Sequence, residues 1–95
     1  MRDYELVFII APVVEGDELE ALVERVTSWI QADGGAVTKV DLWGRRGLAY
    51  PIQKFTEGTY VLLNLQIEPS ALAELERNIK LDTSIIRYLL VRLEK

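Results

Sequence analysis

The chain has 95 residues, 49% of them hydrophobic, and a formal net charge of −4. This length and composition predict one folded domain over residues 1–95 rather than a disordered chain. It has no cysteine, which excludes a disulfide framework, and no histidine, which removes the commonest general base, so we do not expect an enzyme. Asp3 and Glu5 precede a short apolar run unlike a signal peptide or membrane span, so we expect a cytoplasmic protein.

The first half of the chain predicts a strand, a helix and a second strand. Residues 4–10 are almost continuously apolar, which is typical of a central strand covered on both faces. A helix is expected from Asp17 onward, because apolar residues then recur at helical spacing until Gly34 and Gly35. Its acidic side chains predict a solvated face rather than a metal site. Residues 36–43 alternate as an edge strand does, and Pro51 also fits only an edge.

The second half predicts a hairpin loop, two further strands and a second helix. Residues 55–58 are interpreted as the loop, and residues 59–68 as a strand whose Val61, Leu63, Leu65 and Ile67 share one face. Pro69 suits the first turn of a helix. Residues 85–93 give a fourth strand. The resulting order, β-α-β-β-α-β, predicts a ferredoxin-like plait: an α+β fold with a four-stranded antiparallel sheet, two helices on one face and strand order 4-1-3-2.

Charge is divided unevenly along the chain. Residues 15–34 carry one basic and six acidic side chains, a net charge of −5, whereas residues 35–54 and residues 77–95 each carry +3. Because local fields rather than net charge attract polyanions, the acidic total does not exclude a nucleic-acid partner.

The sequence WGRRGLAYPIQK, residues 43–54, is unusual for a plain strand or turn. Arg45 and Arg46 have three interpretations: protection of a sheet edge, surface ion pairs, or contact with a polyanion. Trp43 either packs under the hairpin or belongs to a partner surface. The third strand, EGTYVLLNLQI, resembles the stacking motif of RNA-recognition domains only faintly, since Leu63 and Leu65 stand where aromatic residues are expected.

Several of these residues resemble the bacterial ribosomal small-subunit protein six family. The sequence LAYPI at residues 48–52 carries the resemblance, with Gly44 and Arg46 before it and Lys54 after it. Weaker matches extend over the whole chain, at Arg2-x-Tyr4-Glu5, Pro12, Gly34-Gly35 and Ile86-Arg87-Tyr88-Leu89.

The resemblance implies a structural constituent of the small ribosomal subunit, without catalytic activity or cofactor. It implies binding to the central domain of the small-subunit ribosomal RNA together with ribosomal protein eighteen of the small subunit. The residues expected to contact RNA are basic, and those expected to contact the partner protein are aromatic or apolar. The RNA candidates are Arg2, Arg45, Arg46, Lys54, Arg87 and Arg92, and the partner candidates are Trp43, Tyr50 and Ile52.

Two departures from the family pattern leave alternatives open. Gly47 stands where a basic residue is usual, and Asp3 follows Arg2 where a second basic residue is common. An engineered or diverged scaffold of the same fold without RNA function is therefore one alternative. A small self-associating regulatory plait is the other, because an edge strand is exposed.

Overall fold

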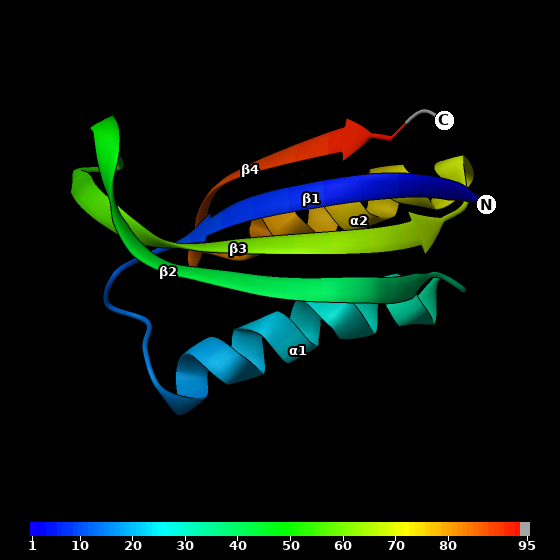
Figure 1. Ribbon diagram of the computed structural model, residues 1–95, viewed down its shortest axis with the longest axis horizontal. Helices are drawn as coiled ribbons and strands as arrows, with labels where there is room; N and C mark the ends of the chain where they lie inside the picture. The colour runs from blue at the N-terminus through cyan, green and yellow to red at the C-terminus, as the bar shows by residue number, and fades with distance from the viewer. Residues whose placement is uncertain (94–95) are drawn as a thin grey trace.

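The computed structural model describes residues 1–93, which form four strands and two helices (Figure 1). The strands make one antiparallel sheet in the order β2-β3-β1-β4, which confirms the predicted plait and places the first and third strands at its centre. The elements are β1 (Arg2–Ile10), α1 (Asp17–Ala32), β2 (Ala36–Ile52), β3 (Phe55–Ile67), a 3₁₀ turn (Pro69–Ala71), α2 (Leu72–Leu81) and β4 (Ile85–Arg92).

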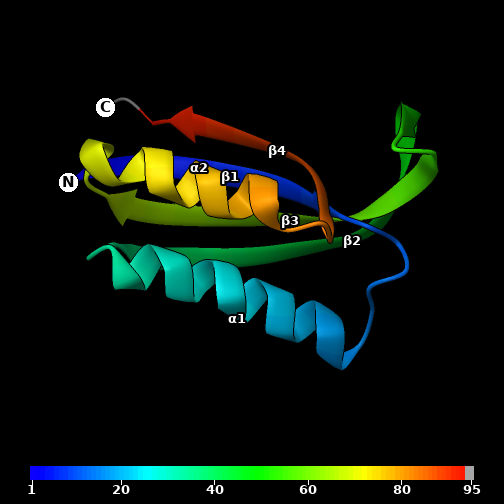
Figure 2. The same ribbon diagram turned by 180° about the vertical axis from the view of Figure 1, so that it is seen from behind.

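Both helices cover the same face of the sheet, as seen from behind in Figure 2. The core lies between them and the central strands, where Leu6 and Phe8 of β1 face Leu63 and Val61 of β3 and are fully buried. The opposite face has no helix over it, and we call it the open face. The termini of the described chain lie at one end of the sheet and the β2–β3 hairpin at the other.

The prediction that β1 is covered on both faces is wrong for most of its length. Its core-facing side chains are buried, but Asp3, Glu5 and Val7 on the open face remain partly exposed. Ile9 is the exception, at 8% exposure, because the β2–β3 hairpin lies over it. A Cβ atom added to Gly58 of β3 would stand 2.5 Å from Cγ2 of Ile9, so glycine at this position permits that close approach.

The helices follow the predicted apolar stripes. Leu22, Val26 and Ile30 are the buried residues of α1, and Leu75 and Ile79 those of α2. Acidic residues occupy the first turn of α1, where the helix dipole favours negative charge. Within residues 1–93, neither helix combines the length and the apolar character that crossing a bilayer would require.

The β2–β3 hairpin is longer than predicted. β2 continues through Gly44 to Ile52, and Phe55 already belongs to β3, so the loop predicted at residues 55–58 is wrong. The turn consists of Gln53 and Lys54 alone, with φ angles of 50° and 73°. Two residues with positive φ form the type of turn whose twist matches the flanking strands, although neither side chain is typical of it.

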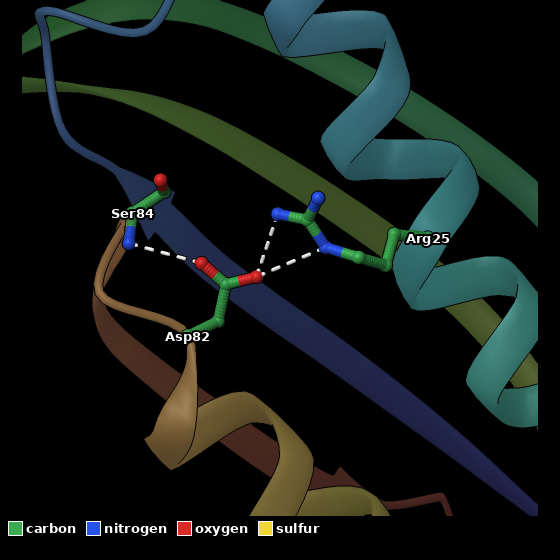
Figure 3. Close-up of polar contacts among 3 residues, drawn as sticks. All are labelled: Arg25, Asp82 and Ser84. Carbon is green, nitrogen blue, oxygen red and sulfur yellow. Dashed lines mark hydrogen bonds and ion pairs between the residues drawn. The ribbon is translucent and has the colours of Figure 1, made fainter.

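A partly buried carboxylate joins α1 to the segment between α2 and β4 (Figure 3). Oδ2 of Asp82 accepts hydrogen bonds from Nε and Nη2 of Arg25, at 3.1 and 2.7 Å. Its other oxygen accepts from the backbone N–H of Ser84 at 3.0 Å. The Asp82 side chain is 11% exposed, and it links α1 to the segment that follows α2.

A second polar contact joins α2 to β4. The hydroxyl of Tyr88 donates to Oε1 of Glu76 at 2.9 Å. Burial raises the pKa of Tyr88, and the hydrogen bond and negative charge of Glu76 raise it further. The phenol therefore keeps its proton, and the bond, beyond the pH at which a free tyrosine ionises.

Candidate functional site

The distal part of the β2–β3 hairpin bends toward β4, across the end of β1. Nε2 of Gln53, in the turn, donates to the backbone carbonyl of Ile86 at 3.5 Å. Nη1 of Arg87 donates to the hydroxyl of Tyr50, and Cζ of Arg87 lies 5.5 Å from the centre of the Tyr50 ring. Residues of the two edge strands and the turn thus meet, at the end of the sheet where Figure 1 shows the hairpin rising.

A second arginine lies on a second aromatic ring nearer the base of the hairpin. Cζ of Arg46 is 5.3 Å from the centre of the Trp43 ring. That ring stacks on Tyr60 of β3, with centroids 6.3 Å apart and planes 12° from parallel. Nε1 of Trp43 donates to Oδ2 of Asp41 at 3.1 Å, which fixes the orientation of the indole.

These two clusters meet at a groove lined by Tyr60, Tyr50 and Arg87, and together they form a surface of two guanidinium groups and three aromatic rings. We call it the hairpin surface, and it consists of Trp43, Arg46, Tyr50, Tyr60 and Arg87. Trp43 and Tyr50 are 38% and 56% exposed, so the rings are available to a partner. Two of the residues expected to bind RNA, Arg46 and Arg87, are therefore in contact with two of those expected to bind protein, Trp43 and Tyr50.

A shallow groove of about 150 Å³ lies beside these rings. Ile52, the third partner candidate, lines it and is half-buried. The other lining residues are Ile9, Leu48, Ala49, Tyr50, Tyr60 and Arg87. The groove is mostly apolar with one cation, an arrangement that suits a side chain of another protein.

Arg45 does not belong to the hairpin surface. Its Nη2 donates to the backbone carbonyl of Pro12 at 2.7 Å, and its Nη1 lies 3.3 Å from Oε1 of Glu57. Its strand position pairs with buried Thr59, which is on the helix-covered side of the sheet. Of the three interpretations of the two arginines, the ion pair holds for Arg45, whereas Arg46 stacks on an aromatic ring.

The remaining three predicted RNA contacts are divided between the two ends of the sheet. Lys54 is exposed in the turn of the hairpin, close to the hairpin surface. Arg2 begins β1 and Arg92 ends β4, so both lie at the end that carries the termini (Figure 1). The chain extends 36 Å along its longest axis, which separates these two arginines from the hairpin.

Sequence reasoning did not include Tyr60 and Gln53 among the site residues. Two signals could have found Tyr60: alternation along the third strand placed it on the face opposite Val61, and it matches the faint RNA-recognition motif of that strand. Gln53 had no such signal, because its role depends on the hairpin bending far enough to reach Ile86.

The described part of the chain, residues 1–93, contains no group of three or more acidic, histidine or cysteine side chains that could hold a metal. Its exposed features are a sheet face with arginine–aromatic pairs and a shallow groove. The fold and this surface define a small α+β binding module.

The comparisons with known proteins agree on one family. The family model described as ribosomal protein S6 matches residues 3–92. Small ribosomal subunit protein bS6 of Moorella thermoacetica is 45% identical over 95 residues, which cover 100% of this chain and 97% of that protein. The same protein of Desulforamulus reducens is 46% identical over 92 residues, covering 97% of each chain.

A solved structure agrees with these relatives. The crystal structure of 30S ribosomal protein S6 from Thermotoga maritima superimposes with a TM-score of 0.92 at 41% identity, covering 97% of this chain and 87% of that one. The C-terminal domain of the MgtC protein from Mycobacterium tuberculosis, at 18% identity and a TM-score of 0.59, shares the fold alone.

The chain belongs to the ribosomal protein S6 family. It is thus a structural, non-enzymatic protein of the small ribosomal subunit that functions in translation. This confirms the resemblance carried by residues 48–52, the prediction that the chain is not an enzyme, and its expected location on the ribosome.

Proposed function

We propose that this chain binds the central domain of the small-subunit ribosomal RNA together with ribosomal protein eighteen of the small subunit, through the hairpin surface. In this proposal the guanidinium groups of Arg46 and Arg87 bind phosphate oxygens of the RNA. The partner protein covers the aromatic rings and the groove that Ile52 lines. Lys54 adds a third positive charge at the tip of the hairpin.

The pairing of each arginine with an aromatic ring carries this proposal. A guanidinium over an aromatic ring is restricted in position, and those of its N–H groups that are not engaged within the chain can bind a phosphate. In each pair the arginine would bind the RNA and the aromatic ring would bind the partner protein. The two binding sites would therefore be adjacent.

The distribution of charge supports the same surface. Among residues 1–93, Arg46, Lys54 and Arg87 take part in no salt bridge, whereas Arg45 is neutralised by Glu57. The acidic residues of α1 lie on the opposite side of the sheet. Three positive charges without an ion pair among the described residues thus lie at the hairpin end of the sheet, where they can attract a polyanion.

Arg2 and Arg92 belong to the proposal as a second, separate contact. They lie at the opposite end of the sheet, so the RNA would have to extend along the sheet to reach both sets. We expect these two arginines to contribute less than the hairpin surface, because neither has an aromatic partner among the described residues.

The proposal is tested by measuring the affinity of the chain for a central-domain RNA fragment, with and without ribosomal protein eighteen, over a series of salt concentrations. We expect binding that is tight only with the partner present and that weakens as salt rises, because phosphate contacts release counterions. A folded chain that binds the fragment under neither condition would overturn the proposal. It would favour the alternative of a diverged family member without RNA function.

A further inference from the structure

We propose that Arg45 is a positioning residue, which holds the base of the β2–β3 hairpin so that the hairpin surface keeps its arrangement, and that it does not contact RNA. This inference rests on the proposed function, since the hairpin surface is the binding site assigned there. It also reverses the expectation, drawn from the sequence, that Arg45 is one of the RNA contacts.

Two of the three guanidinium nitrogens of Arg45, Nη1 and Nη2, make contacts within the chain. Nη2 donates to the carbonyl oxygen of Pro12 at 2.7 Å, a short distance typical of a charge-assisted bond. Nη1 lies 3.3 Å from Oε1 of Glu57, on the neighbouring strand. A phosphate bound bidentately through both Nη atoms would have to compete with these acceptors. Arg46, by contrast, makes no ion pair with the described residues.

The acceptor at Pro12 is itself held by the core. The backbone N–H of Ala11 donates to the carbonyl of Ser84 at 2.9 Å, and the N–H of Ser84 donates to Asp82. Asp82 in turn accepts from Arg25 of α1. A continuous series of hydrogen bonds and covalent links thus runs from the hairpin base to the first helix, and Arg45 is its connection to the hairpin.

The position of Arg45 in the strand explains why this connection affects binding. Directly before it, Gly44 adopts a φ of 82° at an irregularity in the β2–β3 register, where the strand bends. Every residue of β2 that reaches toward β4, including Tyr50, lies beyond Arg45. A hairpin that pivots at Gly44 would carry Tyr50 away from Arg87 and separate the two halves of the hairpin surface.

The neighbouring arginine provides a matched control, because Arg45→Ala and Arg46→Ala remove the same charge from adjacent positions. Amide hydrogen exchange is measured first on the free folded chain. We expect Arg45→Ala to increase the exchange rate of the distal hairpin amides, residues 47–56, about tenfold, the scale of one charge-assisted hydrogen bond. We expect Arg46→Ala to leave those rates within about twofold of the original chain, because it breaks no hydrogen bond to the core.

Binding of the RNA fragment with ribosomal protein eighteen provides the second readout. We expect Arg45→Ala to weaken binding about threefold to tenfold with an unchanged dependence on salt, because no phosphate contact is lost. We expect Arg46→Ala to reduce the slope of log affinity against log salt by about one. Arg45→Lys, which keeps the charge but lacks the two separate nitrogens, should bind more weakly than the original chain.

The opposite results would overturn the inference. If Arg45→Ala reduces the salt slope as Arg46→Ala does, Arg45 contacts RNA. If Arg45→Lys binds as tightly as the original chain, binding does not depend on the two separate hydrogen bonds of Arg45, and the positioning role is wrong. Unchanged exchange of the hairpin amides in Arg45→Ala would overturn the positioning role without any RNA present. That measurement separates failure of this inference from failure of the proposed function.

Discussion

Replacing both Arg46 and Arg87 with alanine is expected to weaken binding to the central-domain RNA fragment, with ribosomal protein eighteen present, about 100-fold at moderate salt. Each guanidinium is held on an aromatic ring on the open face, so each can donate to a phosphate with little loss of side-chain freedom. The slope of log affinity against log salt should fall by about two, one for each lost phosphate contact. Affinity is measured at several salt concentrations for the original and the double variant.

A control with the same change of charge is available on the other side of the sheet. Arg77 and Lys80 of α2 are both exposed, and replacing both with alanine also removes two positive charges. We expect that control to weaken binding less than about threefold, because charges far from the interface act only through a screened field. An equal loss of affinity in both double variants would mean that binding depends on net charge alone. It would contradict the assignment of the hairpin surface as the RNA-binding site.

Replacing Asp82 with alanine is expected to lower the free energy of unfolding by about 2 kcal/mol, chiefly because the part-buried N–H of Ser84 loses its acceptor. The carboxylate also accepts two hydrogen bonds from Arg25, as Figure 3 shows. Arg25 is 48% exposed, so solvent screens that ion pair and it contributes the smaller part. Urea unfolding of the two chains measures the difference.

Two further variants separate the contributions of Asp82. Arg25→Ala removes the ion pair alone, and we expect a loss of about 0.5 kcal/mol. Asp82→Asn keeps an oxygen that can accept a hydrogen bond from the N–H of Ser84. Its loss in free energy of unfolding should therefore lie between the losses of the two alanine variants. If Arg25→Ala is as destabilising as Asp82→Ala, the ion pair rather than the bond to Ser84 would hold this end of the sheet.

The fold could be predicted because its signals are local in sequence. Period-two alternation located the core face of β3, and helical spacing located the buried stripes of α1 and α2. The most apolar segments, β1 and β3, became the central strands of the sheet, as expected. Each of these features depends on which side chains are buried, and the spacing of apolar residues in the sequence indicates this directly.

The hairpin could not be predicted in the same way. Gln53 and Lys54 adopt positive φ without the asparagine or glycine that normally signals such a turn, so the loop was placed too late in the sequence. The register of β2 against β3 also shifts at three places. Because one extra residue moves a side chain to the other face, the face of each hairpin residue depends on these irregularities.

The arrangement of the site residues could not be predicted for this reason. Residue type alone assigned arginines to RNA and aromatic residues to protein, but the bent hairpin places Arg46 on Trp43 and brings Tyr50 to Arg87. The bent hairpin also directs the Arg45 side chain toward Pro12, on the helix-covered side of the sheet. Contacts between residues 37 positions apart, such as Tyr50 and Arg87, depend on tertiary structure and leave no local pattern.

The most direct test of the hairpin surface is amide hydrogen exchange of the chain, free and in complex with ribosomal protein eighteen and the RNA fragment. We expect complex formation to slow amide exchange in residues 43–60 and around Arg87. We expect the exchange rates on the exposed faces of α1 and α2 to stay as in the free chain. Protection confined to the helices, with residues 43–60 unchanged, would contradict it and place the binding surface on the opposite side of the sheet.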